Sequence, residues 1–328
     1  MGRLIVGLFG FLFLCLIAGG VAVLWAKSEF EKPGPLAEEA TVLLPRGVGT
    51  RDIARTLEQN GVIRDRRLFE GGSRALGLAR RFQAGEYRFP AGGSMHEVAL
   101  RIVAGRTVKR YLTVPEGLRS YEVVALIATA DGLSGDIAHV PANGSLLPET
   151  YQYAHGDTRS AMLERMQEAM RTALAEAWRQ RQTDTPLLAP REAVILASII
   201  EKETGLASER PHIAGVFVNR LRRGMPLQSD PTVAFALSPD APLGRALTRA
   251  DLKFDSPFNT YTNKTLPPAP IANPGKAALT AALQPLATKD LYFVADGTGG
   301  HAFARTYDEH RANVRKWRQV QKRQRAAQ

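Results

Sequence analysis

One short segment near the middle of the chain ends in two closely spaced carboxylates and reads Ala197-Ser198-Ile199-Ile200-Glu201-Lys202-Glu203-Thr204-Gly205. The residues before it begin with Pro190, which suits the first turn of a helix, and they stay largely apolar up to Ile200. The pattern predicts a buried helix that ends near Gly205 with two carboxylates at the edge of a core. Burial in such a place raises the pKa of a carboxyl group towards neutrality, which is how a general acid is made.

The two carboxylates are not equivalent. At about 100° per residue, Glu203 continues a stripe of large apolar residues that includes Ile199 and Ile200. Glu201 instead continues a face of smaller residues such as Ala197, which a ligand can approach closely. We therefore expect Glu201 to be the chemical group and Glu203 to be a partner or structural carboxylate. The alternative is that both are solvated acids at a helix end.

Length and charge limit the class of protein. The chain has 328 residues, enough for two or three domains, and 45% of them are hydrophobic, enough for a sizeable core. Its formal net charge of +11 favours anionic surroundings, whether nucleic acid, an anionic membrane or an acidic polymer. The single cysteine, Cys15, excludes an intramolecular disulfide, and it makes a Cys-based metal site or a thiol mechanism untenable.

The N-terminal sequence favours a membrane among these anionic surroundings. Residues 4–26 carry no charge and are long enough to span a bilayer as a helix, with Arg3 before them. We predict a retained single-span anchor with its N-terminus in the cytoplasm. A cleaved signal peptide is the alternative, but Leu24-Trp25-Ala26 matches a cleavage site poorly. Residues 1–27 then form a cytoplasmic tip and transmembrane helix, and residues 28–40 a linker.

A Pro-x-Gly turn recurs three times, at Pro45–Gly47, Pro90–Gly92 and Pro115–Gly117. Each copy follows a strand-like apolar or aromatic residue and precedes an amphipathic helical pattern, so each predicts a compact αβ unit. These units loosely resemble the carbohydrate-binding LysM-type module, which we assign to residues 41–115. The alternative is that good turn chemistry recurs by accident.

Beyond Gly205, proline-stiffened loops carry Gln228, Asp230, Asn259 and Tyr261. Amides that pair with sugar hydroxyls and rings that stack on sugar faces suit the walls of a saccharide groove. We list these four residues and Glu203 as candidate substrate-binding residues. The alternative is that the segments are rigid connecting loops whose amides are satisfied within the protein.

The C-terminal part predicts a buried strand over residues 291–295 and then His301 and His310. The histidines are too far apart, on different elements, to suggest a metal pair, and we expect structural or surface roles for them. Residues 311–325 carry seven basic residues and no acid. They predict a solvated basic helix, or alternatively a contact with anionic lipid or cell-wall polymer.

Taken in order, several motifs resemble the endolytic murein transglycosylases, the MltG or YceG-like family. The resemblance rests on the anchor, on the LysM-like region and on these further segments: residues 147–151, 197–204, 216–221, 227–233, 256–261, 266–275, 292–294 and 301–303. It implies an α+β fold in which residues 116–328 form a mixed catalytic domain with a lysozyme-like glutamate helix and a basic C-terminal helix.

The resemblance also implies a function. The enzyme would cut glycan strands of peptidoglycan between N-acetylmuramic acid and N-acetylglucosamine and leave 1,6-anhydro ends. Its expected role is to end the growth of nascent glycan strands. The essential glutamate of the family carries over onto Glu201, acting as acid and then as base, with no cofactor or metal. The enzyme would sit in the bacterial inner membrane with its catalytic domain outside the cytoplasm. Peptidoglycan synthases and elongation or division proteins are candidate partners, and nucleic acid is not.

Two rival functions remain open at the level of sequence. One is a membrane-anchored glycan-binding scaffold whose carboxylates are structural. The other is a hydrolytic muramidase that uses Glu201 together with Glu203 or Asp230. The identity of the newly formed glycan ends would distinguish them from a transglycosylase.

Overall fold

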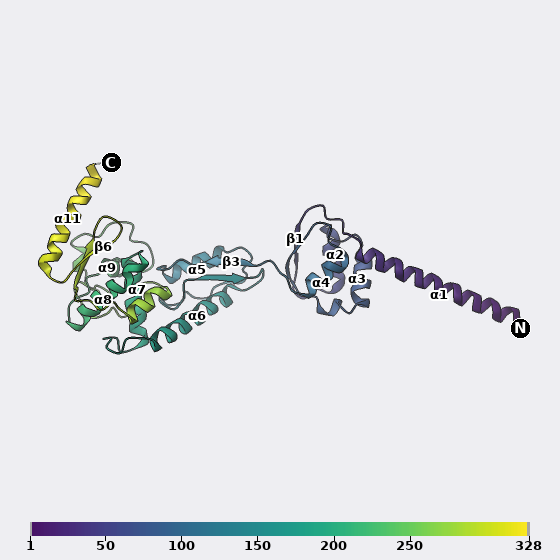
Figure 1. The fold of residues 1–328 in the computed structure, drawn as a ribbon, viewed down its shortest axis with the longest axis horizontal. Coiled ribbons are helices and arrows are strands. Elements are labelled where there is room, and N and C mark those ends of the chain that lie inside the picture. Colours follow the sequence, from purple (N-terminus) through teal and green to yellow (C-terminus); the bar gives the residue numbers. More distant parts are fainter. Residues whose placement is uncertain (1, 327–328) are drawn as a thin grey trace. The chain divides into compact units, whose positions relative to one another are not determined.

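The computed structural model describes residues 2–326 and has the expected mixed α+β architecture (Figure 1). Its contacts divide the chain into two compact units. The first contains the residues up to Arg110 together with Gln152–Gly156, and the second contains the remaining residues from Tyr111 onward. Among the described residues, the strands form three two-stranded sheets.

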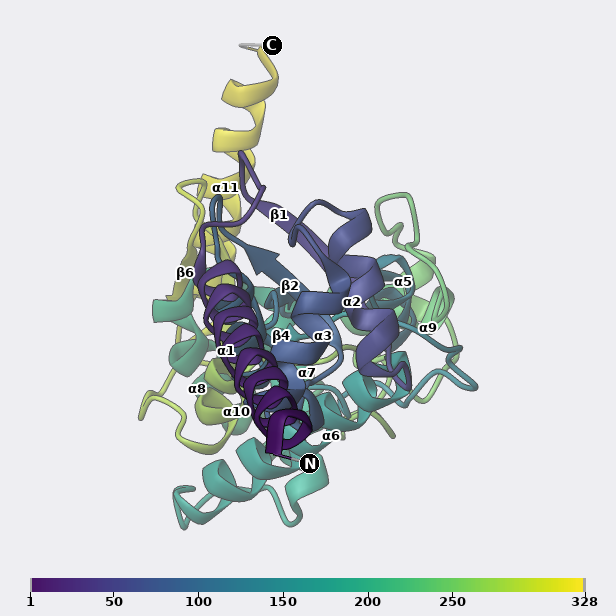
Figure 2. The same ribbon diagram turned by 90° about the vertical axis from the view of Figure 1, so that its right-hand side faces the viewer.

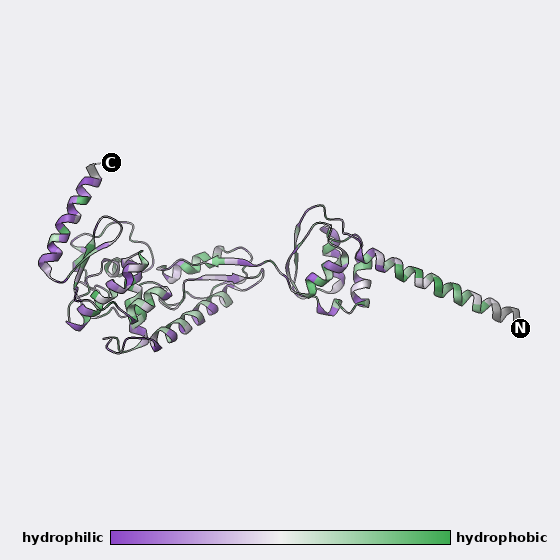
Figure 3. Cartoon of the chain, in the orientation of Figure 1, coloured by the Kyte–Doolittle hydropathy of each residue, from purple (hydrophilic) through white to green (hydrophobic). Residues whose placement is uncertain are grey.

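The first unit begins with helix α1 (Gly2–Glu31). Its segment Gly7–Glu31 is long and apolar enough to cross a membrane, and none of its most apolar 18-residue window is buried in the protein (Figure 3). Only the end of the helix joins the folded core, where the buried Phe30 packs against α3 (Arg66–Ala75). Gly72 makes this contact feasible, because a Cβ there would lie 2.7 Å from the Phe30 ring.

The rest of the first unit packs helices against a two-stranded antiparallel sheet. The elements are β1 (Ala40–Leu44), α2 (Thr50–Gln59), α3, a short 3-10 turn (Ala79–Arg81), β2 (Gly85–Phe89) and α4 (Met95–Val103). Strands β1 and β2 are antiparallel, with Ala40 opposite Phe89. Their inward side chains and the apolar faces of the helices form a core around the fully buried Tyr87 and Phe69.

All three predicted Pro-x-Gly turns lie between a strand and a helix. Gly47, Gly92 and Gly117 have φ values of +79°, +65° and +77°, the left-handed region that glycine adopts without strain. The first two copies lie in the first unit, and the third lies in the second unit. The strand, turn and helix order is therefore confirmed, whereas the likeness to LysM modules stays a prediction.

The second unit is mostly helical. Its elements, with the strand β3 (Arg110–Thr113) that leads into it, are α5 (Ser120–Thr129), β4 (Thr150–Tyr153), α6 (Arg159–Arg179), α7 (Pro190–Glu203), a 3-10 turn (Ala207–Glu209), α8 (Arg210–Arg222), α9 (Asp230–Leu237), a 3-10 turn (Asp251–Lys253), α10 (Lys276–Leu283), β5 (Tyr292–Ala295), β6 (His301–Ala304) and α11 (Tyr307–Ala326). Strand β3 pairs with β4, and β5 pairs antiparallel with β6. The C-terminal half of α11 extends beyond the rest of this unit (Figures 1 and 2).

Helix α7 is the central element of the second unit. It begins at Pro190, as predicted, and every residue from Ala193 to Ile200 is buried. It packs against α6, α8, α9 and α10 in one hydrophobic core. The helix ends at Glu203, where Thr204 takes up an extended conformation. This arrangement places Glu201 and Glu203 in the last turn, where the core meets the surface.

Strand β5 differs from its prediction in one respect. The expected buried strand is present over Tyr292–Ala295, but its side chains are only half-buried. The reason is that β5 has one partner strand, β6, and the pair lies at the edge of the unit beside α11 rather than in its interior.

Candidate active site

Glu201 lies in the last turn of α7 with a side chain only 3% exposed. Its Oε1 accepts a 2.7 Å hydrogen bond from Nη2 of Arg210, and its Oε2 accepts a 2.9 Å hydrogen bond from the backbone N–H of Gly275. Burial raises the pKa of Glu201, and the nearby charge of Glu116 adds to this effect. Gly275 and Arg210 act in the opposite direction, because both stabilise the charged form.

Arg210 joins two carboxylates. The same Nη2 lies 2.8 Å from Oε2 of Glu116, so one guanidinium balances the charges of Glu116 and Glu201. Arg210 is 92% removed from solvent, whereas Glu116 is 40% exposed. Gly275 leaves room for this arrangement, since a Cβ there would lie 1.7 Å from Oε1 of Glu116.

Asn273 holds the loop that carries Gly275. Its fully buried side chain accepts hydrogen bonds from the backbone N–H groups of Gly144 and Leu146. The amide nitrogen donates to the Leu118 carbonyl and to the Ser120 hydroxyl. One side chain thereby ties three segments together, and the N–H that reaches Glu201 is fixed in position as a result.

Glu203 lies in a different environment. It is half-buried and accepts a short hydrogen bond from the hydroxyl of Ser229. Burial raises the pKa of Glu203 to about 7, and the neighbouring charge of Asp230 adds to the rise. The Ser229 hydrogen bond and the positive charges of His301 and Arg220 offset only part of it. A carboxyl group with such a pKa can both give and take a proton near neutral pH.

Asp230 and Tyr261 form a pair beside Glu203. The Tyr261 hydroxyl donates a 2.5 Å hydrogen bond to Oδ1 of Asp230, which is exposed at the first position of α9. Burial, Asp230 and Glu203 all raise the pKa of Tyr261, so it stays protonated and keeps donating. Asp230 is therefore oriented by Tyr261 while part of its carboxylate remains open to a ligand.

Gln228 projects from a strained backbone position. Its φ is +54°, and its N–H donates to the carbonyl of Thr260 at 2.9 Å. The side chain of Gln228 is exposed, and its carbonyl oxygen accepts a 3.3 Å hydrogen bond from Nη1 of Arg220. Arg220 is itself buried and donates to the Leu291 carbonyl at 2.7 Å, so it acts as a fixed positive charge under this loop. The exposure of Gln228 agrees with its prediction as a substrate contact.

Asn259 is placed differently from its prediction as a substrate contact. It is fully buried, and its amide nitrogen donates to the carbonyls of Leu252 and Phe254 at 3.1 and 2.8 Å. Its carbonyl oxygen accepts from the N–H of Tyr261 at 2.9 Å. All of these hydrogen bonds lie within the loop, so the Asn259 side chain does not face solvent. Its role is to set the position of Tyr261.

A cavity of about 550 Å³ lies along this part of the second unit. The residues that line it include Lys202, Asp230, Phe235 and Ile271. Lys202 lies between the two glutamates in the sequence, so the end of α7 borders the cavity. Its volume falls within the range of about 300–1,000 Å³ that is usual for ligand pockets.

No group of three or more His, Cys, Asp or Glu side chains that could hold a metal ion is found within residues 2–326.

Sequence comparison links this site to known proteins. A protein-family profile described as the YceG-like family matches residues 42–316. The chain belongs to the YceG-like family. It is 32% identical, over 336 residues, to an endolytic murein transglycosylase of Bacillus subtilis (strain 168), and the match covers 90% of this chain and 89% of the relative.

Two further relatives support the same placement. An endolytic murein transglycosylase of Streptococcus pneumoniae is 27% identical over 84% of this chain, although the match covers only 57% of that longer protein. The crystal structure of a YceG-like protein from Listeria monocytogenes has a TM-score of 0.52 and 30% identity. That match covers 84% of this chain and 99% of the Listeria chain, so the fold is common to both.

His301 has a structural role in this YceG-like chain. Its Nδ1 lies 2.7 Å from Oε2 of Glu209, and its backbone N–H donates to Oε1 of the same residue at 2.8 Å. Burial on its own would raise the pKa of Glu209, but the bonds from His301 outweigh it and lower the pKa. The pair fixes the start of β6 to the turn that follows α7.

Several important residues of this YceG-like site were not among the predicted ones, namely Glu116, Arg210, Ser229, Asn273 and Gly275. Glu116 is the middle residue of the third Pro-x-Gly turn, and Asn273 and Gly275 belong to the 266–275 segment already noted for its family resemblance. The turn and the segment therefore carry a sequence signal for Glu116, Asn273 and Gly275. Arg210 gives no such signal, because an arginine at the start of a helix is ordinary until its burial is known.

Proposed function

We propose that this chain is a membrane-anchored endolytic lytic transglycosylase. It cleaves peptidoglycan glycan strands between N-acetylmuramic acid and N-acetylglucosamine and leaves 1,6-anhydro ends. The observation that carries the proposal is the half-buried Glu203, whose pKa of about 7 suits an acid that is protonated at the start of the reaction and a base afterwards. The names of the relatives support the same reaction class.

We propose Glu203, rather than Glu201, as the group that moves the proton. Both oxygens of Glu201 are occupied by Arg210 and Gly275, and its side chain has little access to a ligand. Glu203 accepts one side-chain hydrogen bond, from the hydroxyl of Ser229, and it lies beside the exposed Asp230. The charge on Glu201 then serves to hold Arg210 and the end of α7 in place, which makes Glu201 a positioning residue.

The reaction uses one carboxyl group in two steps. Protonated Glu203 gives its proton to the glycosidic oxygen as the bond to C1 of the muramic acid breaks. The resulting carboxylate then removes the proton from the C6 hydroxyl of the same sugar, whose oxygen bonds to C1. The proton returns to Glu203 and no water is consumed. A second carboxylate is not needed as a nucleophile, unlike in a retaining hydrolase.

The neighbouring residues support this sequence of steps. The negative charge of Asp230 stabilises the positive charge that develops on the sugar ring, and Tyr261 fixes its orientation. The exposed Gln228 supplies an amide for a sugar hydroxyl. Asn259 acts indirectly by holding Tyr261.

The hydrolytic muramidase remains the second candidate. The observation that favours it is the exposed Asp230, which lies close enough to Glu203 to raise its pKa. Such a carboxylate could activate a water molecule or attack C1 directly. This route differs from the first in its products, because it leaves reducing ends.

We propose that Gly7–Glu31 is the anchor and that the catalytic unit lies outside the cytoplasm. Its length and composition, and the exposure of its most apolar 18-residue window, support a membrane location. An enzyme held at this membrane would meet new glycan strands as they are made. The terminase role and the synthases or elongation and division proteins as partners follow from that location.

The test compares the full chain in detergent or nanodiscs with two charge-neutral variants, Glu203→Gln and Glu201→Gln. Peptidoglycan is digested, and the fragments are identified by mass spectrometry. We expect internal fragments with anhydro ends from the natural chain, a loss of at least about 100-fold for Glu203→Gln, and a smaller loss for Glu201→Gln. A greater loss for Glu201→Gln would return the proton transfer to Glu201. No cleavage by the folded natural chain would favour the scaffold.

A further inference from the structure

Helix α11 carries a row of positive charge along one face. Arg311, Arg315, Arg318 and Lys322 are all exposed, and they follow an i, i+4, i+7, i+11 spacing. At 100° and 1.5 Å per residue, this spacing makes a straight row about 16 Å long. In the hydropathy view α11 is mostly hydrophilic, with a few hydrophobic residues along it (Figure 3). We call these four residues the basic row.

The opposite face of α11 holds the helix on the second unit. The Cβ position of Gly297 would lie 2.6 Å from Val320 and 3.4 Å from Trp317, so both side chains pack on the turn between β5 and β6. His310 stacks on Tyr292 with a distance of 5.2 Å between ring centroids. Trp317, Val320 and His310 are thereby used in packing, and by helical geometry the basic row faces away from them.

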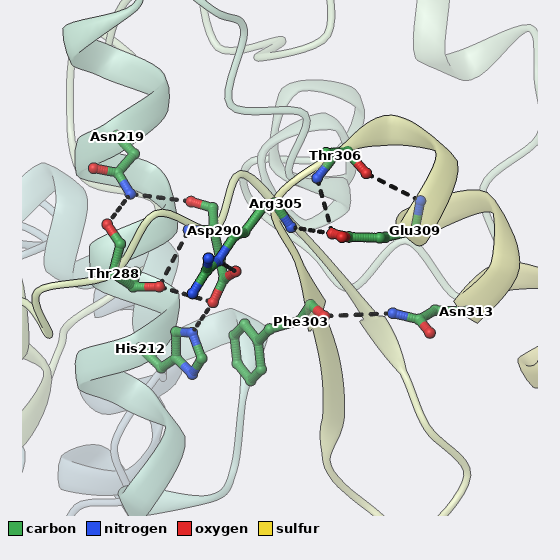
Figure 4. Close-up of polar contacts among 9 residues, drawn as sticks. All are labelled: His212, Asn219, Thr288, Asp290, Phe303, Arg305, Thr306, Glu309 and Asn313. Atoms are coloured by element: carbon green, nitrogen blue, oxygen red, sulfur yellow. Dashed lines mark hydrogen bonds and ion pairs between the residues drawn. The ribbon is translucent and has the colours of Figure 1, made fainter.

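The start of α11 is fixed as well (Figure 4). Glu309 accepts hydrogen bonds from the N–H groups of Arg305 and Thr306, and its own N–H donates to the Thr306 hydroxyl at 3.3 Å. Asn313 donates to the Phe303 carbonyl at 3.4 Å. Because the helix is capped and tied to β6, the basic row is a preformed surface that does not have to fold on binding.

The positive charge of the row is largely uncompensated. Arg311 lies 4.0 Å from the exposed Asp308, but in the described part of the chain no carboxylate lies within ion-pair distance of Arg315, Arg318 or Lys322. From Arg311 onward, α11 contains no acidic residue. Such a fixed row of uncompensated positive charges attracts a negatively charged surface.

We propose that the basic row binds the anionic lipid headgroups of the membrane that anchors the chain. The inference rests on the anchoring proposed above, because α1 keeps such lipids at a high local concentration and even a weak second contact is then populated. Clusters of four to eight basic residues are typical of binding to anionic lipid. The exposed face has no large apolar side chain, so α11 would lie on the headgroups without inserting.

The test uses the full chain in nanodiscs. Cys15 is replaced by serine, and Gln319→Cys places a fluorophore beside the basic row. Nanodiscs contain phosphatidylcholine alone or with phosphatidylglycerol, and a quencher is attached to a fraction of the headgroups. We expect quenching in the anionic discs, little in the neutral discs, and loss of quenching at 1 M salt, where the Debye length is about 3 Å.

A charge-reversal variant and a matched control complete the test. The first changes all four residues of the basic row to glutamate and should lose the quenching. The second reverses four exposed basic residues elsewhere in the second unit, Arg179, Arg223, Lys253 and Lys264, and should keep it.

Three outcomes would overturn the proposal: equal quenching in both kinds of disc, an unaffected row variant, or a control variant that loses quenching as well. Soluble polyphosphate that shields the fluorophore in neutral discs, with no effect of anionic lipid, would also overturn it and point to a phosphate polymer. Retention of the chain in the discs and its activity on peptidoglycan are measured in parallel. A failure of the anchor or of the proposed reaction is thereby separated from a failure of the basic row.

Discussion

The carboxylate of Glu201 accepts a 2.7 Å hydrogen bond from Nη2 of Arg210. The pair is buried at the end of α7, with side chains that are 3% and 10% exposed. Removing one partner of such a pair leaves an uncompensated charge in a poorly solvated place, which costs more than the pair contributes while intact. The relationship makes the end of α7 sensitive to changes at Arg210.

Arg210→Leu should therefore lower the free energy of unfolding by about 3 kcal/mol. Arg222→Leu is the matched control, because it lies on the same helix and its partner Asp184 is 73% exposed. An exposed pair of this kind contributes about 1 kcal/mol or less. Urea unfolding of both variants measures the difference. Equal losses would show that Arg210 does not hold a buried charge.

The raised pKa of Glu203 predicts how stability depends on pH. The pKa is about 7 in the folded protein and near 4.5 in the unfolded chain, so the folded state binds the proton more tightly. This contribution is fully present below pH 4.5 and is lost as the pH rises to about 7. It amounts to about 3 kcal/mol. Urea unfolding between pH 4.5 and 8 should show the decline, and Glu203→Gln should remove it.

The same group should control the pH profile of cleavage. If protonated Glu203 starts the reaction, kcat/KM falls as the pH rises through about 7. Glu201→Gln should keep this falling limb, because the variant leaves Glu203 in place. A profile whose falling limb disappears in Glu201→Gln would contradict the assignment.

Tyr261→Phe removes the hydroxyl that orients Asp230 and leaves the ring in place. A hydrogen bond to a charged group is worth about 1.5–3 kcal/mol, so we expect kcat to fall by about 10-fold or more. KM should change less, because the bond positions a group that acts on the transition state. The two constants, measured on a defined glycan oligomer, test this. A change confined to KM would instead mean that Tyr261 binds the sugar directly.

Asn273→Ala should lower stability and activity together. The buried amide makes four hydrogen bonds, and its loss leaves buried backbone groups without partners, for a cost of about 3 kcal/mol. Asn60→Ala is the control, because Asn60 is exposed and bonds one carbonyl. If both variants unfolded at the same urea concentration as the natural chain, the proposed role of Asn273 in holding Gly275 would be wrong.

The local features of the fold could be predicted from the sequence. Pro190 marks the start of a helix, and the Pro-x-Gly turns precede helices, because both effects depend on a few neighbouring residues. The acids at the end of α7 were located for the same reason. Distant contacts could not be predicted: nothing in the sequence indicates that Arg210 and Gly275 reach Glu201, or that Ser229 reaches Glu203.

The position of Glu203 on its helix shows how this limits the prediction of the site. Helical geometry places Glu203 on the stripe of large apolar residues, and this position alone predicts a structural role. The same position accounts for the burial that raises the pKa of Glu203, so it supports a chemical role once the surroundings are known. Asn259 shows the opposite case. Its sequence context predicts a contact with substrate, but its amide nitrogen donates both of its hydrogen bonds to carbonyls within its own loop.

The measurement that tests the account most directly is the mass of the new glycan ends after digestion by the full chain in water enriched in heavy oxygen. An intramolecular attack by the C6 hydroxyl takes up no solvent oxygen. We therefore expect anhydro-muramic acid ends that lack the heavy isotope and are lighter, by one water, than reducing ends. Reducing ends that carry the heavy isotope would contradict the account and would establish hydrolysis.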